Sequence, residues 1–219
     1  MTSALLFDLD GTLVDTDHVH LAAFQRVFAP HGVTLDRARY NAEIMGAPND
    51  AIGRAFLPHL DEPARRRALE EKEEIYRAEV GDVTPIDGLV ELLDFTDRRG
   101  LQRAVVTNAP RANAELVLAA IGLAERLPIR VIGGELERSK PDPLPYLTGL
   151  ERTGAHAERS LAFEDSLSGV RAAAAAGLYV IGLKTSLDDE RLIAAGAALT
   201  VANFRDARIY EAIERRIGG

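Results

Sequence analysis

Two aspartates, Asp8 and Asp10, directly follow a short apolar segment near the N-terminus. If that segment, Ala4–Phe7, is a buried strand, both carboxylates lie at its carboxyl end, where open α/β sheets bind ligands. Carboxylates this close repel each other and raise each other's pKa unless a cation lies between them. A hard divalent cation with oxygen ligands meets that need. The alternative is an ordinary turn at Asp10-Gly11, and this segment alone favours neither interpretation.

A hydroxyl and an amide, those of Thr107 and Asn108, follow a second apolar segment, Ala104–Val106. Thr107 can hydrogen-bond a phosphate oxygen, and Asn108 can add a donor. The competing interpretation is that one of the two is the N-cap of the next helix, since Pro110 suits a helix start. Taken alone, this pair favours the N-cap.

A lysine, Lys140, lies in the run Ser139-Lys140-Pro141-Asp142-Pro143 and is one of only three lysines in the chain. The prolines stiffen its loop, because each fixes one backbone dihedral. An ammonium group held in this way is a good point-charge partner for a phosphate or for an anionic nucleophile. The alternative is an ordinary surface lysine.

Two adjacent acids, Glu164 and Asp165, follow a third apolar segment, Ser160–Phe163. Such a pair at the end of a strand suits Mg²⁺, which takes oxygen ligands directly or through water. Asp165 could instead cap the following helix, and Ser166 offers the same possibility.

Hydrophobic patterning predicts the elements that would bring these groups together. Strand-like apolar runs occupy Ala4–Phe7, Ala104–Val106, Ile129–Ile132, Ser160–Phe163, Tyr179–Gly182 and, more weakly, Ala198–Val201. Helical spacing lies between them at Leu89–Arg98, Ala112–Ile121 and Leu167–Ala176. Unbroken apolar strands that alternate with helices predict an α/β protein with a Rossmann-like, doubly wound parallel sheet. The carboxyl ends of such strands share one edge, so the four motifs can converge there.

Residues 17–83 interrupt this alternation, because they show helical periodicity and no convincing strand. We therefore predict an inserted all-helical cap domain over residues 17–83 and a core domain formed by residues 1–16 and 84–219. Asp15–Asp17 and Gly81–Pro85 are the expected hinges. Within the insert, Glu62–Glu79 is heavily charged with opposite charges four residues apart, which favours a solvated helix face.

Together the motifs resemble those of the haloacid dehalogenase superfamily, in the branch with a helical C1-type cap that includes β-phosphoglucomutase and phosphoglycolate phosphatase. The resemblance covers the full chain. Its motifs are, in order, Asp8-Leu9-Asp10-Gly11-Thr12-Leu13-Val14-Asp15, Thr107-Asn108, Lys140-Pro141 and Glu164-Asp165-Ser166. It implies a phosphoric monoester hydrolase that uses Mg²⁺ and acts on a small phosphorylated metabolite.

The resemblance also implies a role for each motif acid. Asp8 would attack phosphorus and form an aspartyl-phosphate. Asp10 would protonate the leaving oxygen and later deprotonate the attacking water. Mg²⁺ would be held by the carboxylates of Asp8 and Asp165 and by the backbone carbonyl of Asp10, with Glu164 adding a direct or water-mediated contact.

The phosphate itself would be held by the second and third motifs. Thr107, the backbone N–H of Asn108 and Lys140 would contact its oxygens, where negative charge accumulates during the reaction. A fourth candidate for substrate binding is His20, which lies near the expected hinge; an ordinary helix histidine is the alternative. Arg54 is expected to point from the cap toward the cleft.

Two local features favour hydrolysis over the other activities of the superfamily. The dehalogenases lack the second acid of the first motif, whereas Asp10 is present here. The mutase pattern has a lysine just before the cap glycine and an arginine three residues after it, whereas this chain has Met45 and Asn49 around Gly46. Losing both basic groups weakens the second phosphate site that a mutase needs. The alternatives left open are a β-phosphoglucomutase-type mutase and a catalytically silent module that binds a phosphometabolite.

Composition agrees with this expectation. The 219 residues carry a net charge of −8, which argues against nucleic acid or an anionic membrane as the main partner. The chain has no cysteine, which excludes disulfides, zinc–thiolate sites and cysteine nucleophiles. It has neither signal-peptide pattern nor transmembrane stretch, so we expect a cytoplasmic protein that is a monomer or a weak homodimer.

Overall fold

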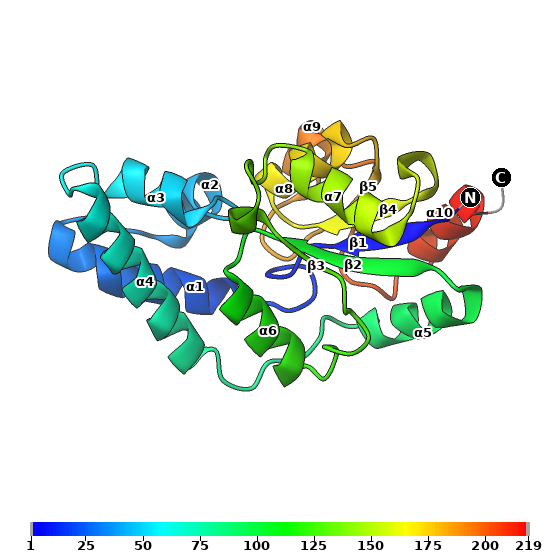
Figure 1. Ribbon diagram of the computed structural model, residues 1–219, viewed down its shortest axis with the longest axis horizontal. Coiled ribbons are helices and arrows are strands. Elements are labelled where there is room, and N and C mark those ends of the chain that lie inside the picture. The colour runs from blue at the N-terminus through cyan, green and yellow to red at the C-terminus, as the bar shows by residue number, and fades with distance from the viewer. Residues whose placement is uncertain (1, 218–219) are drawn as a thin grey trace.

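A six-stranded parallel sheet lies at the centre of the larger part of the molecule (Figure 1). The computed structural model describes residues 2–217, so residues 1, 218 and 219 of the expected core domain lie outside it. The strands are β1 (Ala4–Phe7), β2 (Gln102–Thr107), β3 (Arg130–Ile132), β4 (Leu161–Glu164), β5 (Tyr179–Leu183) and β6 (Leu199–Val201). Their order is β3-β2-β1-β4-β5-β6. The strands β1 to β3 are added toward one edge of the sheet and β4 to β6 toward the other, so the point where the strand order reverses lies between β1 and β4.

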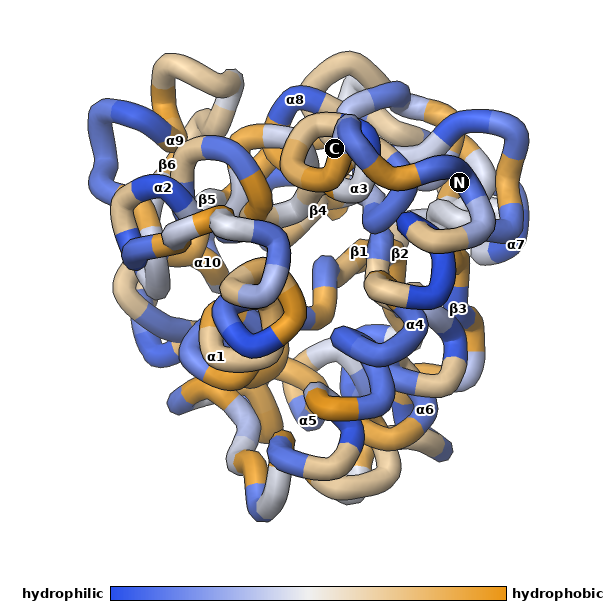
Figure 2. Tube along the Cα trace, turned by 90° about the vertical axis from the view of Figure 1, so that its left-hand side faces the viewer, coloured by the Kyte–Doolittle hydropathy of each residue, from blue (hydrophilic) through white to orange (hydrophobic). Residues whose placement is uncertain are grey.

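Helices cover both faces of this sheet. Successive residues of β1 show the alternation, because Leu5 and Phe7 belong to one apolar core whereas Ala4 and Leu6 belong to another. The first core is completed by α5 (Leu89–Arg99), α6 (Arg111–Ala120) and α10 (Ala207–Ile217). The second is completed by α7 (Leu144–Thr153), α8 (Leu167–Ala175) and α9 (Asp189–Ala195). The end-on view places β1, β2 and β4 at the centre with helices around them (Figure 2). The predicted fold class is confirmed.

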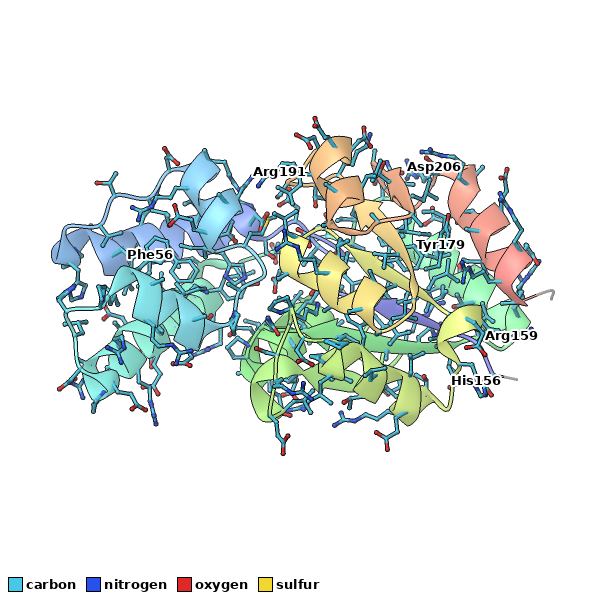
Figure 3. The ribbon with its side chains drawn as sticks, turned by 90° about the horizontal axis from the view of Figure 1, so that it is seen from above. Phe56, His156, Arg159, Tyr179, Arg191 and Asp206 are labelled. Atoms are coloured by element: carbon cyan, nitrogen blue, oxygen red, sulfur yellow. The ribbon has the colours of Figure 1, made fainter. Side chains whose placement is uncertain are left out.

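Four helices form a separate cluster beyond the carboxyl edge of the sheet (Figure 1), and we call this cluster the cap. They are α1 (Asp17–Phe28), α2 (Arg37–Glu43), α3 (Asn49–Phe56) and α4 (Glu62–Glu79). They pack on an apolar core of their own that includes Phe24, Phe28 and Phe56, and Figure 3 shows Phe56 among these helices. Between Asp17 and Val83, all of which the structure describes, the chain forms helices and no strand. The exact boundaries of the two domains stay a prediction.

The two connections between cap and sheet run side by side. Val14 forms an isolated antiparallel bridge with Pro85, and the N–H of Ile86 donates to the carbonyl of Leu13 at 2.8 Å. Short 3-10 turns complete the helical structure at Ala29–His31, Gly133–Glu135 and Ala157–Arg159. No helix within residues 2–217 has the length and apolar character needed to cross a membrane.

The charged helix α4 differs from the expectation of a solvated face. Asp61 caps its first turn by accepting from the N–H of Ala64, and most of its charges are exposed. Lys72 and Glu73 are instead buried, with exposed fractions of 2% and 5%. The expectation is therefore wrong for these two residues, because they lie on the same side of the helix as the apolar stripe that contains Tyr76.

Candidate active site

The four sequence motifs meet in one cleft between the sheet edge and the cap. Asp8 follows β1, Thr107 ends β2 and Glu164 ends β4, and these three parallel strands are neighbours in the sheet. The core side of the cleft is lined by Asp8, Asp10, Thr107, Asn108, Lys140, Asp165 and Ser166. Its cap side is lined by residues that include His20, Phe24, Tyr40, Met45, Asn49, Ile52, Lys72 and Glu73.

Lys140 is buried between two carboxylates. Its Nζ donates to Asp8 Oδ1 and to Glu164 Oε1, each at 2.6 Å, and the residue is 1% exposed. Tyr146 donates its hydroxyl to the same Glu164 oxygen at 2.6 Å. Burial lowers the pKa of Lys140, but the charges of Asp8 and Glu164 outweigh it and hold the pKa above its usual value. The alternative of an ordinary surface lysine is therefore wrong.

Three buried carboxylates form a cluster that suits a divalent cation. Asp8, Glu164 and Asp165 each offer a ligand oxygen, and these atoms lie within 4.8 Å of one another. Burial, together with repulsion from neighbouring carboxylates, raises the pKa of Asp8 and of Asp165 well above the usual range. Asp165 Oδ2 is buried and has no hydrogen-bond partner among the residues that the structure describes. An acceptor left unpaired among like charges fits Mg²⁺, which prefers hard oxygen ligands.

The position of Glu164 depends on the start of helix α8. Ser166 is the N-cap, since its Oγ accepts from the N–H of Gly169 at 3.1 Å, and the same Oγ donates to Glu164 Oε2 at 3.1 Å. A Cβ at Gly169 would lie 1.9 Å from Glu164 Oε1, so only glycine leaves room for this carboxylate. Because Ser166 takes the cap position, the alternative role of Asp165 as the N-cap is wrong.

Thr107 and Asn108 lie at the core edge of the cleft, and neither caps helix α6. The N-cap residue is Pro110, so the favoured alternative for this pair is wrong. Asn108 Nδ2 donates to the carbonyls of Gly46 and Lys140 at 2.9 and 3.2 Å, and its Oδ1 accepts from the N–H of Lys140 at 3.2 Å. Its side chain thus ties the cap to the loop of Lys140. These contacts occupy the side chain, which leaves the backbone N–H of Asn108 as the group for the predicted phosphate contact.

The carboxylate of Asp10 faces the cap and the hinge and lies apart from the acidic cluster. Its Oδ1 accepts from Thr16 Oγ1 at 2.6 Å and from the Tyr76 hydroxyl at 3.1 Å, and it lies 3.3 Å from His20 Nε2. Burial raises the pKa of Asp10, but the charge of His20 and these hydrogen bonds lower it to about 2. His20 is itself buried and stacks on Tyr76 with ring centroids 3.9 Å apart. The structure therefore brings His20 to the site, beside the candidate general acid.

The comparison with known proteins agrees with this geometry. A family model described as "Haloacid dehalogenase-like hydrolase" matches residues 5–183. The chain belongs to this family. The hydrolase is similar to "Phosphorylated carbohydrates phosphatase" from Thermotoga maritima, with 33% identity over 209 residues that cover 90% of this chain and 93% of the relative. It is also similar to "Phosphoglycolate phosphatase" from Xylella fastidiosa, with 34% identity over 178 residues that cover 80% and 76% of the two chains.

Solved structures confirm the fold of the hydrolase. A β-phosphoglucomutase from Clostridium difficile superposes over 100% of both chains with a TM-score of 0.88. At 22% identity, this likeness concerns the fold alone. The predicted family and branch are confirmed, since phosphoglycolate phosphatases and β-phosphoglucomutase structures are among the proteins that the chain resembles. The roles of the individual site residues stay predictions.

The cleft residues absent from the candidates chosen by sequence include a buried ion pair, Lys72 and Glu73 of the hydrolase. Lys72 Nζ lies 2.9 Å from His20 Nδ1 and donates to Glu73 Oε1 at 3.0 Å. Glu73 also accepts from Asn49 Nδ2 and Asn113 Nδ2, each at 2.6 Å. A signal for both existed in the sequence, because they lie four and three residues before a buried tyrosine on helix α4.

Arg54 and the three histidines His31, His59 and His156 lie outside the cleft. Arg54 is exposed, pairs with Asp50 and is not among the residues that line the cleft, so the expectation that it points toward the cleft is wrong. His31 and His59 contact each other at the cap surface, 3.3 Å apart between ring nitrogens. His156 lies at the end of the molecule opposite the cap (Figure 3). Neither the pair nor His156 contributes to the cleft.

The raised pKa values of the acidic cluster predict how stability depends on pH. A carboxyl whose pKa is higher in the folded state binds its proton more tightly there. Stability is therefore lost as pH rises from the ordinary pKa of about 4 toward the raised value. We expect the metal-free hydrolase to lose more stability between pH 5 and 8 than the Asp165→Asn variant, which lacks one of these groups.

Urea unfolding in EDTA at several pH values measures this difference directly. Titrating groups outside the acidic cluster are shared by the two proteins, so their contribution cancels in the comparison. Removing Asp165 also removes its repulsion of Asp8, which weakens the pH dependence of the variant further. Equal pH slopes for the wild type and Asp165→Asn would contradict the raised pKa of the cluster.

Proposed function

We propose that the protein is a Mg²⁺-dependent phosphatase that hydrolyses a small phosphomonoester through an aspartyl-phosphate on Asp8. At the coarser level, the predicted enzyme class of a phosphoric monoester hydrolase is confirmed by the family and by relatives named as phosphatases. The observation that carries the finer proposal is the buried cluster of Asp8, Glu164 and Asp165 around Lys140.

The residues present fit a bound Mg²⁺. Asp8, Asp165 and the backbone carbonyl of Asp10 would hold the ion, with Glu164 beside them, as hard oxygen ligands of the kind it prefers. When bound there, Mg²⁺ supplies positive charge that offsets the repulsion between a carboxylate nucleophile and an anionic phosphate.

The first half of the proposed reaction is an attack by a carboxylate oxygen of Asp8 on phosphorus. The new O–P bond forms as the ester P–O bond breaks, and the leaving oxygen takes a proton from Asp10. Lys140, held against Asp8 at 2.6 Å, stabilises the charge that develops on the phosphoryl oxygens, with Thr107 and the Asn108 N–H as further donors.

The second half regenerates the enzyme. Asp10 accepts a proton from water as the water oxygen attacks the aspartyl-phosphate, which releases inorganic phosphate and restores the Asp8 carboxylate. The low pKa of Asp10 in the structure means that it is ionised there at neutral pH. A dianionic phosphate bound nearby raises that pKa and so favours the protonated form that the first half requires.

The proposed substrate is a small phosphorylated metabolite such as a sugar phosphate. The Thermotoga maritima relative is named for phosphorylated carbohydrates and the Xylella fastidiosa relative for phosphoglycolate. The mutase gains no support over the phosphatase, since Met45 and Asn49 line the cleft where basic residues would bind a second phosphate. A cytoplasmic location and a monomeric or weakly dimeric state stay predictions.

Metal removal tests this proposal. We expect hydrolysis of p-nitrophenyl phosphate and of a panel of phosphorylated metabolites to fall to background after treatment with EDTA, and to return with millimolar Mg²⁺. Mg²⁺ should also raise the melting temperature, because an ion that binds only the folded state stabilises it.

Three outcomes would overturn the proposal. Full activity in EDTA would contradict the metal site. No activity with any ester in Mg²⁺ would favour the silent binding module. Conversion of β-glucose 1-phosphate to glucose 6-phosphate, given a trace of bisphosphate, would identify a mutase.

A further inference from the structure

The cap side of the cleft carries a buried ion pair between Lys72 and Glu73. The two side chains are 2% and 7% exposed and lie 3.0 Å apart. This wall also carries His20 and Asp17. Its other lining residues are apolar or neutral and include Phe24, Tyr40, Ile44, Met45, Asn49 and Ile52. A substrate whose phosphate lies at Lys140 and Asp8 would place its leaving group against this wall, because the cap closes the cleft on that side.

The cations of the cleft are already engaged by carboxylates. Among the described residues that line it, five carboxylates face two lysines and His20, and no arginine is present. His20 lies beside Asp10, with 3.3 Å between His20 Nε2 and Asp10 Oδ1. Lys140 pairs with Asp8 and Glu164 at the phosphate end. Lys72 pairs with Glu73, and its Nζ lies 4.4 Å from the centroid of the Phe24 ring. The cap end therefore has no uncommitted cation for a second anionic group.

Glu73 is held as a carboxylate with one acceptor position left. Its Oε1 accepts from Lys72 and Asn49, and its Oε2 accepts from Asn113 of the core helix α6. Burial raises the pKa of Glu73, but the charge of Lys72 and these hydrogen bonds lower it overall, so the group is ionised at neutral pH. A carboxylate offers about four lone-pair positions, of which three are used. The fourth, on Oε2, can accept from an O–H of the leaving group.

We propose that Glu73 determines specificity by selecting phosphomonoesters whose leaving group is a neutral polyol. One hydroxyl of the polyol donates to Glu73, whereas a second phosphate or a carboxylate at this place meets a buried like charge and is rejected. This inference rests on the proposed phosphatase function and adds the chemical class of the substrate.

Two pairs of esters that differ in charge test the proposal. In the first pair, glycerol 3-phosphate has a hydroxymethyl group where 3-phosphoglycerate has a carboxylate. In the second pair, fructose 1,6-bisphosphate carries one phosphate more than fructose 6-phosphate. For wild type we expect kcat/KM to be at least about tenfold higher for the ester of each pair whose leaving group is uncharged. A tenfold ratio corresponds to one like-charge contact of about 1.4 kcal/mol.

The Glu73→Gln variant keeps the shape of the side chain and removes its charge, which leaves Lys72 unpaired. We expect the ratio of kcat/KM between neutral and anionic esters to fall at least about tenfold, while p-nitrophenyl phosphate is still hydrolysed. Glu71→Gln is the matched control, because Glu71 is exposed on the same helix, and its ratio should equal that of wild type.

The outcomes separate this inference from the function on which it rests. Wild type that releases phosphate from no ester would overturn the phosphatase proposal. Wild type that hydrolyses the anionic member of each pair as fast as the neutral one would overturn only the role of Glu73. An unchanged ratio in a folded Glu73→Gln protein would overturn that role as well.

Discussion

The Asp8→Asn variant should release phosphate from any substrate at less than about one thousandth of the wild-type rate, because an amide cannot attack phosphorus as a carboxylate does. The fold should survive, because the substitution is nearly isosteric and removes one of three buried like charges. Phosphate release in Mg²⁺ and a thermal melt followed by circular dichroism measure the two effects.

Asp94→Asn is the matched control for this loss, since Asp94 is exposed on helix α5 and does not line the cleft. We expect it to keep wild-type activity. A folded Asp8→Asn protein with substantial phosphatase activity would remove Asp8 from its proposed role as the nucleophile.

The Lys140→Met variant should lose both activity and stability. Methionine fills much of the same space but leaves Asp8 and Glu164 buried without their shared cation. Breaking one partner out of a buried ion pair costs about 3–5 kcal/mol in typical proteins, and we expect a loss of that order in EDTA at pH 8. Loss of the charge that stabilises the phosphoryl oxygens should reduce kcat by at least about a hundredfold.

Lys184→Met provides the comparison, because Lys184 pairs with Asp189 at the surface. Exposed pairs contribute less than about 1 kcal/mol, so this variant should keep nearly full stability and activity. Urea unfolding and steady-state kinetics on both variants test the contrast. A Lys140→Met protein that retains more than a third of wild-type kcat would contradict the proposed role of Lys140.

The sheet could be predicted from the sequence because its strands are buried on both faces. Every residue of a strand such as Ala4–Phe7 is then apolar, and a short unbroken apolar run is a sequence pattern typical of such strands. Each predicted strand is present, with ends that differ by two residues at most. Three helices, α7, α9 and α10, lie outside the segments predicted as helical. Helix α9 has only seven residues, which leaves little room for a periodic pattern. Helix α10 carries buried Ile209, Ala212 and Ile213 at helical spacing, so a signal for it existed in the sequence.

The two N-cap alternatives show where local sequence is ambiguous. Asp165 and Ser166 are both good caps, and the choice depends on which side chain reaches the N–H of Gly169. Helix α6 has Pro110 at its N-cap position, so Thr107 and Asn108 do not cap the helix and instead line the cleft. Competing chemistries of this kind are decided by backbone direction at the strand end, which the tertiary structure sets.

The sequence by itself determined the family, the parallel sheet and the order of the motifs from Asp8 to Asp165, since these depend on residue type and spacing along the chain. Only the tertiary structure decided that Lys140 joins Asp8 to Glu164, and that Lys72 and Glu73 face the cleft. A charged helix has the same local pattern whether or not one side is covered. Contacts between α4, α1 and the core helix α6, far apart in the chain, bury that side.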